Sequence, residues 1–135
     1  MRHLTLAAMA CLSLAACKQD AAAPPDVLGT GTEWTVTEIA GTPVPEGVTV
    51  TMQRPEPGML AGTSGCNRYG GPIRAEKGRI HIGALVGTRM MCPDPQMTVE
   101  TAFHSTIGRV TGARKSGTVL ELTDDAGTVL IRARH

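Results

Sequence analysis

Short stretches of alternating hydrophobic and polar residues run through most of this chain and predict β-strands. Val48, Val50 and Met52 alternate with two threonines, so that one face of this strand is apolar. The segment 34–39 is rich in strand-forming residues and is followed by a glycine and a proline that end it. Further strands are expected at 59–63, 73–75, 79–82, 119–122 and 128–133, with hairpin turns at 77–78 and 124–127.

The spacing changes from two residues to three or four in one segment, which predicts a single helix. Its apolar residues recur at intervals of four, four and three, on one helical face; they are Val99, Phe103, Ile107 and Val110. Asp94 suits the N-cap, Pro95 the first helical position, and Gly112 a stop. Seven or eight short strands and one helix predict the α+β class, with a curved antiparallel sheet.

The N-terminus has the pattern of an export signal. Arg2 and His3 form a basic head, and the uncharged segment 4–14 is too short to span a bilayer. Leu14-Ala15-Ala16-Cys17 resembles the lipobox of bacterial lipoproteins, in which cleavage before the cysteine makes it the acylated first residue. The resemblance implies a lipoprotein signal peptide at 1–16 and lipidation of Cys17. An ordinary signal peptide with a chance cysteine is the alternative.

Several acyl chains on Cys17 would hold the protein stably at a membrane. The next residue is Lys18 and not aspartate, which by resemblance to the sorting rule of Gram-negative lipoproteins implies the periplasmic face of the outer membrane. Residues 17–32, rich in Ala, Pro, Gly and Thr, predict a lipidated cysteine followed by a flexible stalk. The folded domain is then expected over residues 33–135.

The charges of the chain are balanced. It has 13 Lys and Arg against 12 Asp and Glu, and loss of residues 1–16 removes one of the basic residues. A net charge near zero argues against nucleic acid as a partner, because binding needs many phosphate-neutralising side chains. The remaining length suits one domain with one core, and we expect a monomer.

Two segments carry the other cysteines: GCNRYGG at 65–71 and TRMMCPDP at 88–95. Together with Trp34, a helix containing Glu100 and a C-terminal hairpin, they resemble the META domain, the HslJ-like heat-shock lipoprotein family. The resemblance covers about residues 33–133. It implies a small antiparallel sheet or partial barrel wrapped against one helix, and a place in the cell envelope. It implies no particular reaction.

The cysteine count predicts a disulfide. Cys11 leaves with the signal peptide and Cys17 is acylated, so that Cys66 and Cys92 are the pair that remains in an oxidising compartment. In the chain-entropy model such a bond stabilises the fold by about 3 to 4 kcal/mol.

Two chemical alternatives use the same cysteines. With His81 and His104 they supply ligand types for zinc, and Met90 and Met91 would suit copper(I), although no close ligand pairing is present. A cysteine hydrolase would use Cys66 as nucleophile and Asn67 to orient a histidine base, but needs a free thiolate.

Other polar and apolar groups have a structural interpretation. Gly70 and Gly71 are expected to permit left-handed backbone at a turn, and Arg68 and Arg89 to bond loop carbonyls. The core residues are expected to include Trp34, Tyr69 and Phe103 together with Met52, Met59, Met90, Met91 and Met97 as filler. A methionine-lined groove for an apolar ligand is the alternative. Arg109, Arg114, Lys115, Arg132 and Arg134 are expected on a solvated face, or against lipid headgroups or an acidic partner.

The sequence therefore predicts a non-catalytic, lipid-anchored envelope lipoprotein without a cofactor. Its work would be envelope maintenance or the stress response, through binding of an envelope protein partner. The alternative is a periplasmic protein that binds a metal or a small ligand.

Overall fold

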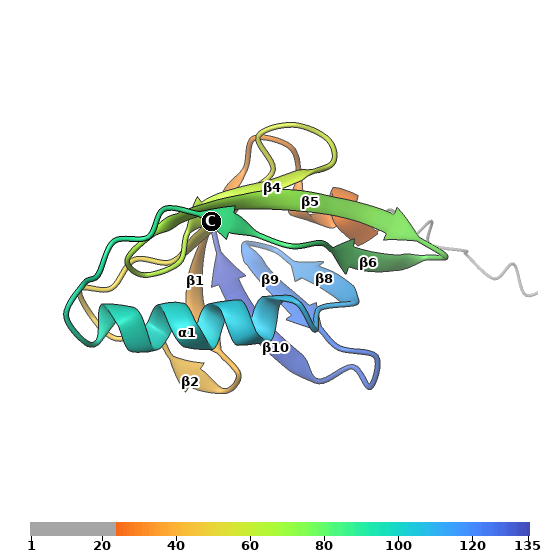
Figure 1. The fold of residues 1–135 in the computed structure, drawn as a ribbon. Helices are drawn as coiled ribbons and strands as arrows, with labels where there is room; N and C mark the ends of the chain where they lie inside the picture. The colour runs from red at the N-terminus through yellow and green to blue at the C-terminus, as the bar shows by residue number, and fades with distance from the viewer. Residues whose placement is uncertain (1–23) are drawn as a thin grey trace, which may run out of the picture.

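The computed structural model describes residues 24–135, which form a curved sheet with one α-helix packed across it (Figure 1). The strand order is β6-β5-β4-β3-β1-β10-β9-β8, with β2 paired to β1 and β7 to β5, and all these pairs are antiparallel. The predicted fold class, an α+β fold with a curved sheet on one helix, is confirmed. The strands are β1 (Glu33–Ile39), β2 (Thr42–Pro43), β3 (Thr51–Gln53), β4 (Met59–Thr63), β5 (Arg68–Glu76), β6 (Arg79–Ile82), β7 (Val86–Gly87), β8 (Gly112–Ser116), β9 (Val119–Thr123) and β10 (Val129–Arg134).

The helix α1 (Gln96–Ile107) is where the apolar spacing predicts it, with different ends. Pro95 stands at the N-cap, one residue before the predicted position inside the helix. Asp94 still serves the first turn, because its Oδ1 accepts hydrogen bonds from the backbone N of Thr98 at 3.2 Å and from its Oγ1 at 2.7 Å. The helix ends at Gly108 and not at Gly112, which begins β8. Among residues 24–135, no helix has the length and hydropathy that crossing a bilayer requires.

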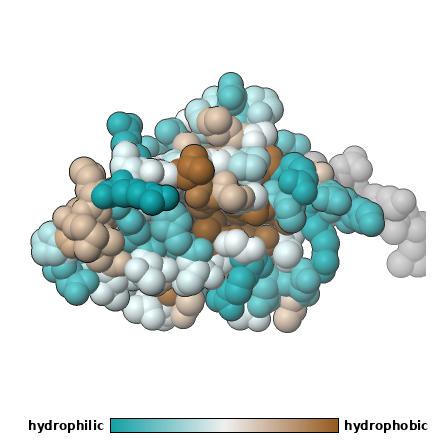
Figure 2. Space-filling model, viewed as in Figure 1, coloured by the Kyte–Doolittle hydropathy of each residue, from teal (hydrophilic) through white to brown (hydrophobic). Residues whose placement is uncertain are grey.

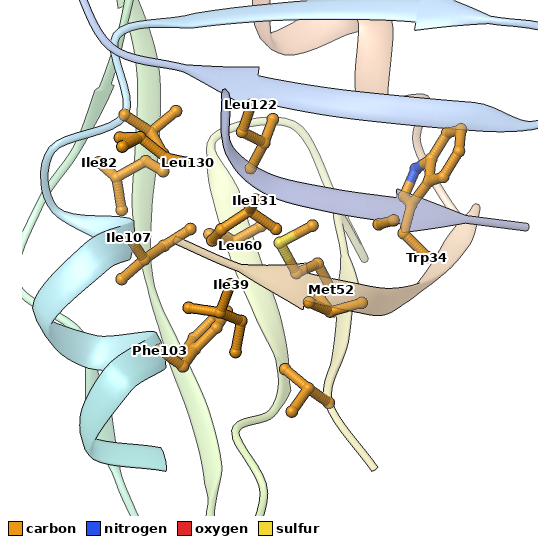
Figure 3. Packing of buried hydrophobic residues seen from close by; sticks show 14 of the residues in the cluster. Trp34, Ile39, Met52, Leu60, Ile82, Phe103, Ile107, Leu122, Leu130 and Ile131 are labelled. Carbon is orange, nitrogen blue, oxygen red and sulfur yellow. The ribbon is translucent and has the colours of Figure 1, made fainter. Parts of the chain in front are cut away.

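The core lies between the concave side of the sheet and α1 (Figure 3). Trp34 and Phe103 are fully buried and Tyr69 is 5% exposed, as predicted for the three aromatic residues. Phe103 lies beside Ile39 of β1 in Figure 3. Aliphatic residues from eight elements complete the cluster, so that a core poor in aromatic residues is filled by Leu, Ile and Val.

Both predicted hairpin turns are present. Lys77 and Gly78 connect β5 to β6 with φ angles of 51° and 76°, the left-handed conformation that tight two-residue turns require. The prediction for Gly70 and Gly71 is wrong, because both lie inside β5 and neither has a positive φ. A Cβ on Gly71 would lie 2.7 Å from the carbonyl oxygen of Ala84, so the glycine allows a close backbone approach there.

The folded part begins earlier than predicted. Residues Pro24–Leu28 form a 3-10 helix, η1, that packs against β5, β6 and β8. Leu28 is 1% exposed, and its carbonyl oxygen accepts a 2.7 Å hydrogen bond from the indole nitrogen of Trp34. A flexible stalk as far as residue 32 is therefore wrong for residues 24–32. The predicted signal peptide and Cys17 lie outside the described residues.

Candidate functional site

Three segments that are distant in sequence meet at the start of α1. They are the turn between β4 and β5, the loop between β7 and α1, and the first turns of the helix. Gly65 brings the first of them close to the helix: a Cβ there would lie 2.8 Å from the carbonyl oxygen of Gln96 and 3.3 Å from the nitrogen of Glu100. Its φ of +117° also favours glycine. The GCNRYGG motif therefore begins with a contact that only glycine makes without strain.

Glu100 is the acceptor at the centre of this junction. Its Oε2 accepts hydrogen bonds from the backbone N of Cys66 at 3.2 Å, the backbone N of Asn67 at 2.7 Å and the Oγ of Ser64 at 2.9 Å. Its Oε1 accepts a further bond of 2.7 Å from Nδ2 of Asn67. Partial burial alone would raise the pKa of Glu100, but these hydrogen bonds outweigh it and lower the pKa below its usual value.

Asn67 connects the helix to the loop before it. Its side chain is 3% exposed, and its Oδ1 accepts hydrogen bonds from the backbone N of Met90 at 2.7 Å and from Oγ1 of Thr88 at 2.9 Å. Its Nδ2 donates to the carbonyl oxygen of Met90 at 3.0 Å as well as to Glu100. Asn67 therefore fixes the backbone of the loop at Met90 from both sides, where sequence reasoning expects only a turn residue.

A disulfide joins the same segments. Cys66 and Cys92, 26 residues apart in sequence, are bonded, with a distance of 5.8 Å between their Cα atoms. We refer to Ser64, Cys66, Asn67, Cys92 and Glu100 as the Asn67–Glu100 cluster. Its polar members are satisfied by one another and by Thr88 and Met90 of the loop, which is the pattern of a structural junction that fixes one loop.

The structure bears directly on the hydrolase alternative. The sulfur of Cys66 is in the disulfide and is not a thiolate, so the cysteine mechanism is contradicted. Ser64 lies 3.2 Å from Nε2 of His104 and also contacts Glu100, which superficially resembles a catalytic arrangement. However, Ser64 is fully buried, and the carboxylate contacts the serine and not the histidine.

The metal ligands of the alternative are not brought together. His81 is exposed on β6, as predicted from its place between two isoleucines, and the two cysteines are bonded to each other. Within residues 24–135, no group of three or more His, Cys, Asp or Glu side chains is placed to hold a metal ion. The ring of His104 contacts the hydroxyl of Ser64 instead of a second metal-ligating side chain.

The loop that the cluster fixes carries two exposed methionines. We call residues 88–92 the methionine loop; Met90 is 56% exposed and Met91 is 85% exposed. The prediction that they fill the core is wrong, and so is that for Met59, which is 40% exposed. Met52 is fully buried, as predicted. Figure 2 shows hydrophobic colour at this end of the molecule and again between β5 and α1.

An apolar groove lies beside the start of α1. It has a volume of about 290 Å³ and lies between the β1–β2 turn and the first half of α1. Val44 and Pro45 line one side, and Pro95 and Val99 line the other. Pro95, which lines the groove, is three residues after the end of the methionine loop in the sequence.

The basic residues of the C-terminal third lie on a solvated face, as predicted. Arg114 and Arg132 both donate to the carboxylate of Glu121, and Arg132 also contacts Glu38 at 3.0 Å. Hydrogen bonds from the two arginines lower the pKa of Glu121. Arg68 and Arg89 are predicted to donate hydrogen bonds to loop carbonyls. Within residues 24–135, neither guanidinium group makes such a bond.

One signal for the site was visible in the sequence. Glu100 is the one carboxylate in the helical segment 96–107 and follows the core residue Val99. An acid at the border of an apolar helical face requires partners, and the amide-rich turn at 65–67 supplies them. Ser64 gave no such signal, because it is fully buried only through the approach of α1.

The fold and this junction define a small α+β domain built on a curved antiparallel sheet with one disulfide-fixed loop. The chain belongs to the META domain family, which matches residues 27–135. It is similar to a protein from Burkholderia xenovorans whose structure was solved by NMR, with a TM-score of 0.64 and 27% identity over 100% of this chain and 98% of that chain. A second NMR structure, with a TM-score of 0.59 and 20% identity, covers 82% of this chain and 92% of that chain and shares the fold. No curated protein matches the chain.

Proposed function

We propose that this protein is a non-catalytic, lipid-anchored protein of the bacterial cell envelope. It would be tethered through Cys17 to the periplasmic face of the outer membrane and act in envelope maintenance or the stress response by binding another envelope protein. The lipobox-like segment at 14–17 supports the anchor, and membership of the META domain family supports the domain.

The observation that carries the binding role is the methionine loop. Exposed methionines adapt to different apolar surfaces, which suits them to protein contacts. This loop is fixed by Asn67 on one side and by the disulfide at Cys92 on the other, so little conformational entropy is lost when a partner binds. The groove between the β1–β2 turn and α1 offers the partner a second apolar contact.

The anchor is tested by labelling growing cells with an alkyne analogue of palmitate. We expect the wild-type chain to be labelled and a Cys17→Ser variant to be unlabelled, because acylation needs the sulfur of that residue. A Cys11→Ser variant is the matched control and is expected to be labelled like the wild type. Label that persists in Cys17→Ser, or that is absent from the wild type, would contradict the anchor.

The binding surface is tested with a photo-crosslinking residue placed at Met91 in living cells. We expect one adduct of defined mass, and its loss when Met90→Asp is added, because a charge in the apolar contact is costly to bury. The control carries the same crosslinker at Val119, an exposed residue of β9 that is 38% accessible. Equal adducts at both positions, or none at Met91, would contradict the proposal.

A further inference from the structure

A buried arginine holds η1 against the curved sheet at the N-terminal end of the described chain. Arg54 is 5% exposed, and its backbone forms an isolated bridge with Thr30. Both hydrogen bonds of its side chain come from Nη1, which donates to the carbonyl oxygen of Pro25 at 2.6 Å and to Oδ1 of Asp26 at 3.3 Å. One corner of the guanidinium therefore has a structural role.

The opposite edge of the same guanidinium carries a donor that the fold covers and leaves unpaired. Nε is buried and has no hydrogen-bond partner among residues 24–135. Nε and Nη2 form the side-on fork of an arginine, whose two parallel N–H donors match the oxygens of a carboxylate or phosphate. A buried donor without an acceptor is destabilising, so the fold would gain from an anion that reaches this edge.

Arg54 is also part of the wall of a surface pocket. The pocket has a volume of about 240 Å³, and its charged lining residues are Arg54, Arg74 and Asp26. Arg74 is half exposed and is held 3.2 Å from Glu76, an exposed pair that contributes little and can exchange its carboxylate for another anion. The lining therefore has two guanidinium groups against one carboxylate.

We propose that this pocket binds the phosphate group of an anionic ligand, with Arg54 as the fixed contact and Arg74 as the mobile second contact. The ligand we favour is the headgroup of a membrane phospholipid. Pro25 and Asp26 line the pocket, and the proposed lipid anchor at Cys17 is eight residues before Pro25. Eight residues span at most about 29 Å, so the headgroups of the anchoring membrane are within reach. The choice of a lipid rests on the proposed anchor, whereas the pocket itself does not.

The test follows the Nε–H resonance of Arg54 by NMR in the full lipidated chain. In maltoside micelles, inorganic phosphate is the free probe. In nanodiscs, phosphatidylglycerol is compared with galactosyl diacylglycerol, a lipid without phosphate. We expect the Arg54 resonance to shift in phosphatidylglycerol discs and to stay unchanged in galactolipid discs.

Two substitutions with opposite expected effects test the charges, and neither removes the buried arginine. Arg74→Gln is expected to weaken phosphate binding about fivefold, as loss of one charge-assisted contact does. Asp26→Asn is expected to strengthen it by a similar factor, because the one opposing carboxylate is lost. Arg109→Gln, an exposed arginine that follows α1 and does not line the pocket, is the matched control and is expected to bind like the wild type.

The outcomes separate the possible ligands. A shift with inorganic phosphate that responds to Arg74→Gln, but no difference between the two discs, would confirm the pocket and overturn the lipid as its ligand. No shift with either phosphate source, or equal binding by Arg74→Gln and the wild type, would overturn the proposal. The palmitate labelling described above gives the same result in all these cases, so failure of the pocket and failure of the anchor are distinguishable.

Discussion

Cys66→Ala and Cys92→Ala are each expected to lower the free energy of unfolding by about 3 to 4 kcal/mol, and the double variant is expected to be no less stable than either single variant. The bond restricts the unfolded chain over a loop whose ends are 26 residues apart, and either substitution removes that whole restriction. For a domain of this size the melting temperature should fall by roughly 10 to 20 °C. Thermal unfolding followed by circular dichroism measures it.

A reducing agent supplies the control for this experiment. It should lower the melting temperature of the wild type to that of the variants and leave the Cys66→Ala variant unchanged. Clearly additive losses in the double variant would contradict the common origin of the two effects, because two independent side-chain contacts would then be involved.

Replacement of Glu100 is expected to have a comparable effect. Glu100→Ala removes the acceptor of four hydrogen-bond donors, including those of the buried residues Ser64 and Asn67. Leaving such donors unpaired costs about 1 to 3 kcal/mol each where they cannot reach water, so we expect a loss of about 3 to 5 kcal/mol. Urea unfolding at pH 7 measures it, with Glu56→Ala, an exposed acid in the β3–β4 loop, as the matched control within about 0.5 kcal/mol of the wild type.

The same carboxylate gives the fold a defined pH dependence. Its pKa is lowered in the folded protein, so Glu100 stabilises the fold above its unfolded pKa of about 4.3. That contribution is lost as the pH falls through the lower folded pKa. Between pH 7 and pH 3 the wild type should therefore lose more stability than Glu100→Gln.

Other acids with lowered pKa values, Glu121 and Asp125, are present in both proteins and cancel in this difference. The comparison is repeated in a His104→Gln background, because His104 is a second titratable group that contacts Ser64. Parallel pH curves for wild type and Glu100→Gln would contradict the assigned role.

Local pattern was sufficient to predict most of the elements. Period-two alternation predicted β3 through Val50 and Met52, and the spacing of Val99, Phe103 and Ile107 predicted the buried face of α1. These predictions succeeded because the hydrophobic period is set by the geometry of a strand or a helix, whatever the rest of the chain does. The two hairpins could be predicted because a tight turn is determined by the residues at its own four positions.

What the sequence could not predict depends on contacts between distant segments. Asn67 looked like a turn residue, and its role comes from a loop more than 20 residues later. Leu28 lies in a segment rich in Pro and Gly, yet Arg54 and Trp34 hold that segment on the sheet. Met90 and Met91 have core-like hydropathy, but Asn67 and the disulfide fix their backbone at the surface. Hydropathy predicts what a side chain prefers, and the tertiary contacts decide whether it is buried.

The packing around Trp34 gives this protein an internal optical reporter. Trp34 is the one tryptophan of the chain, and it is fully buried beneath Lys115 and the C-terminal His135. Its indole N–H is bonded to Leu28, the last residue of η1. Its emission wavelength therefore reports on whether the N-terminal segment is docked, and no dye or label is needed to follow that segment.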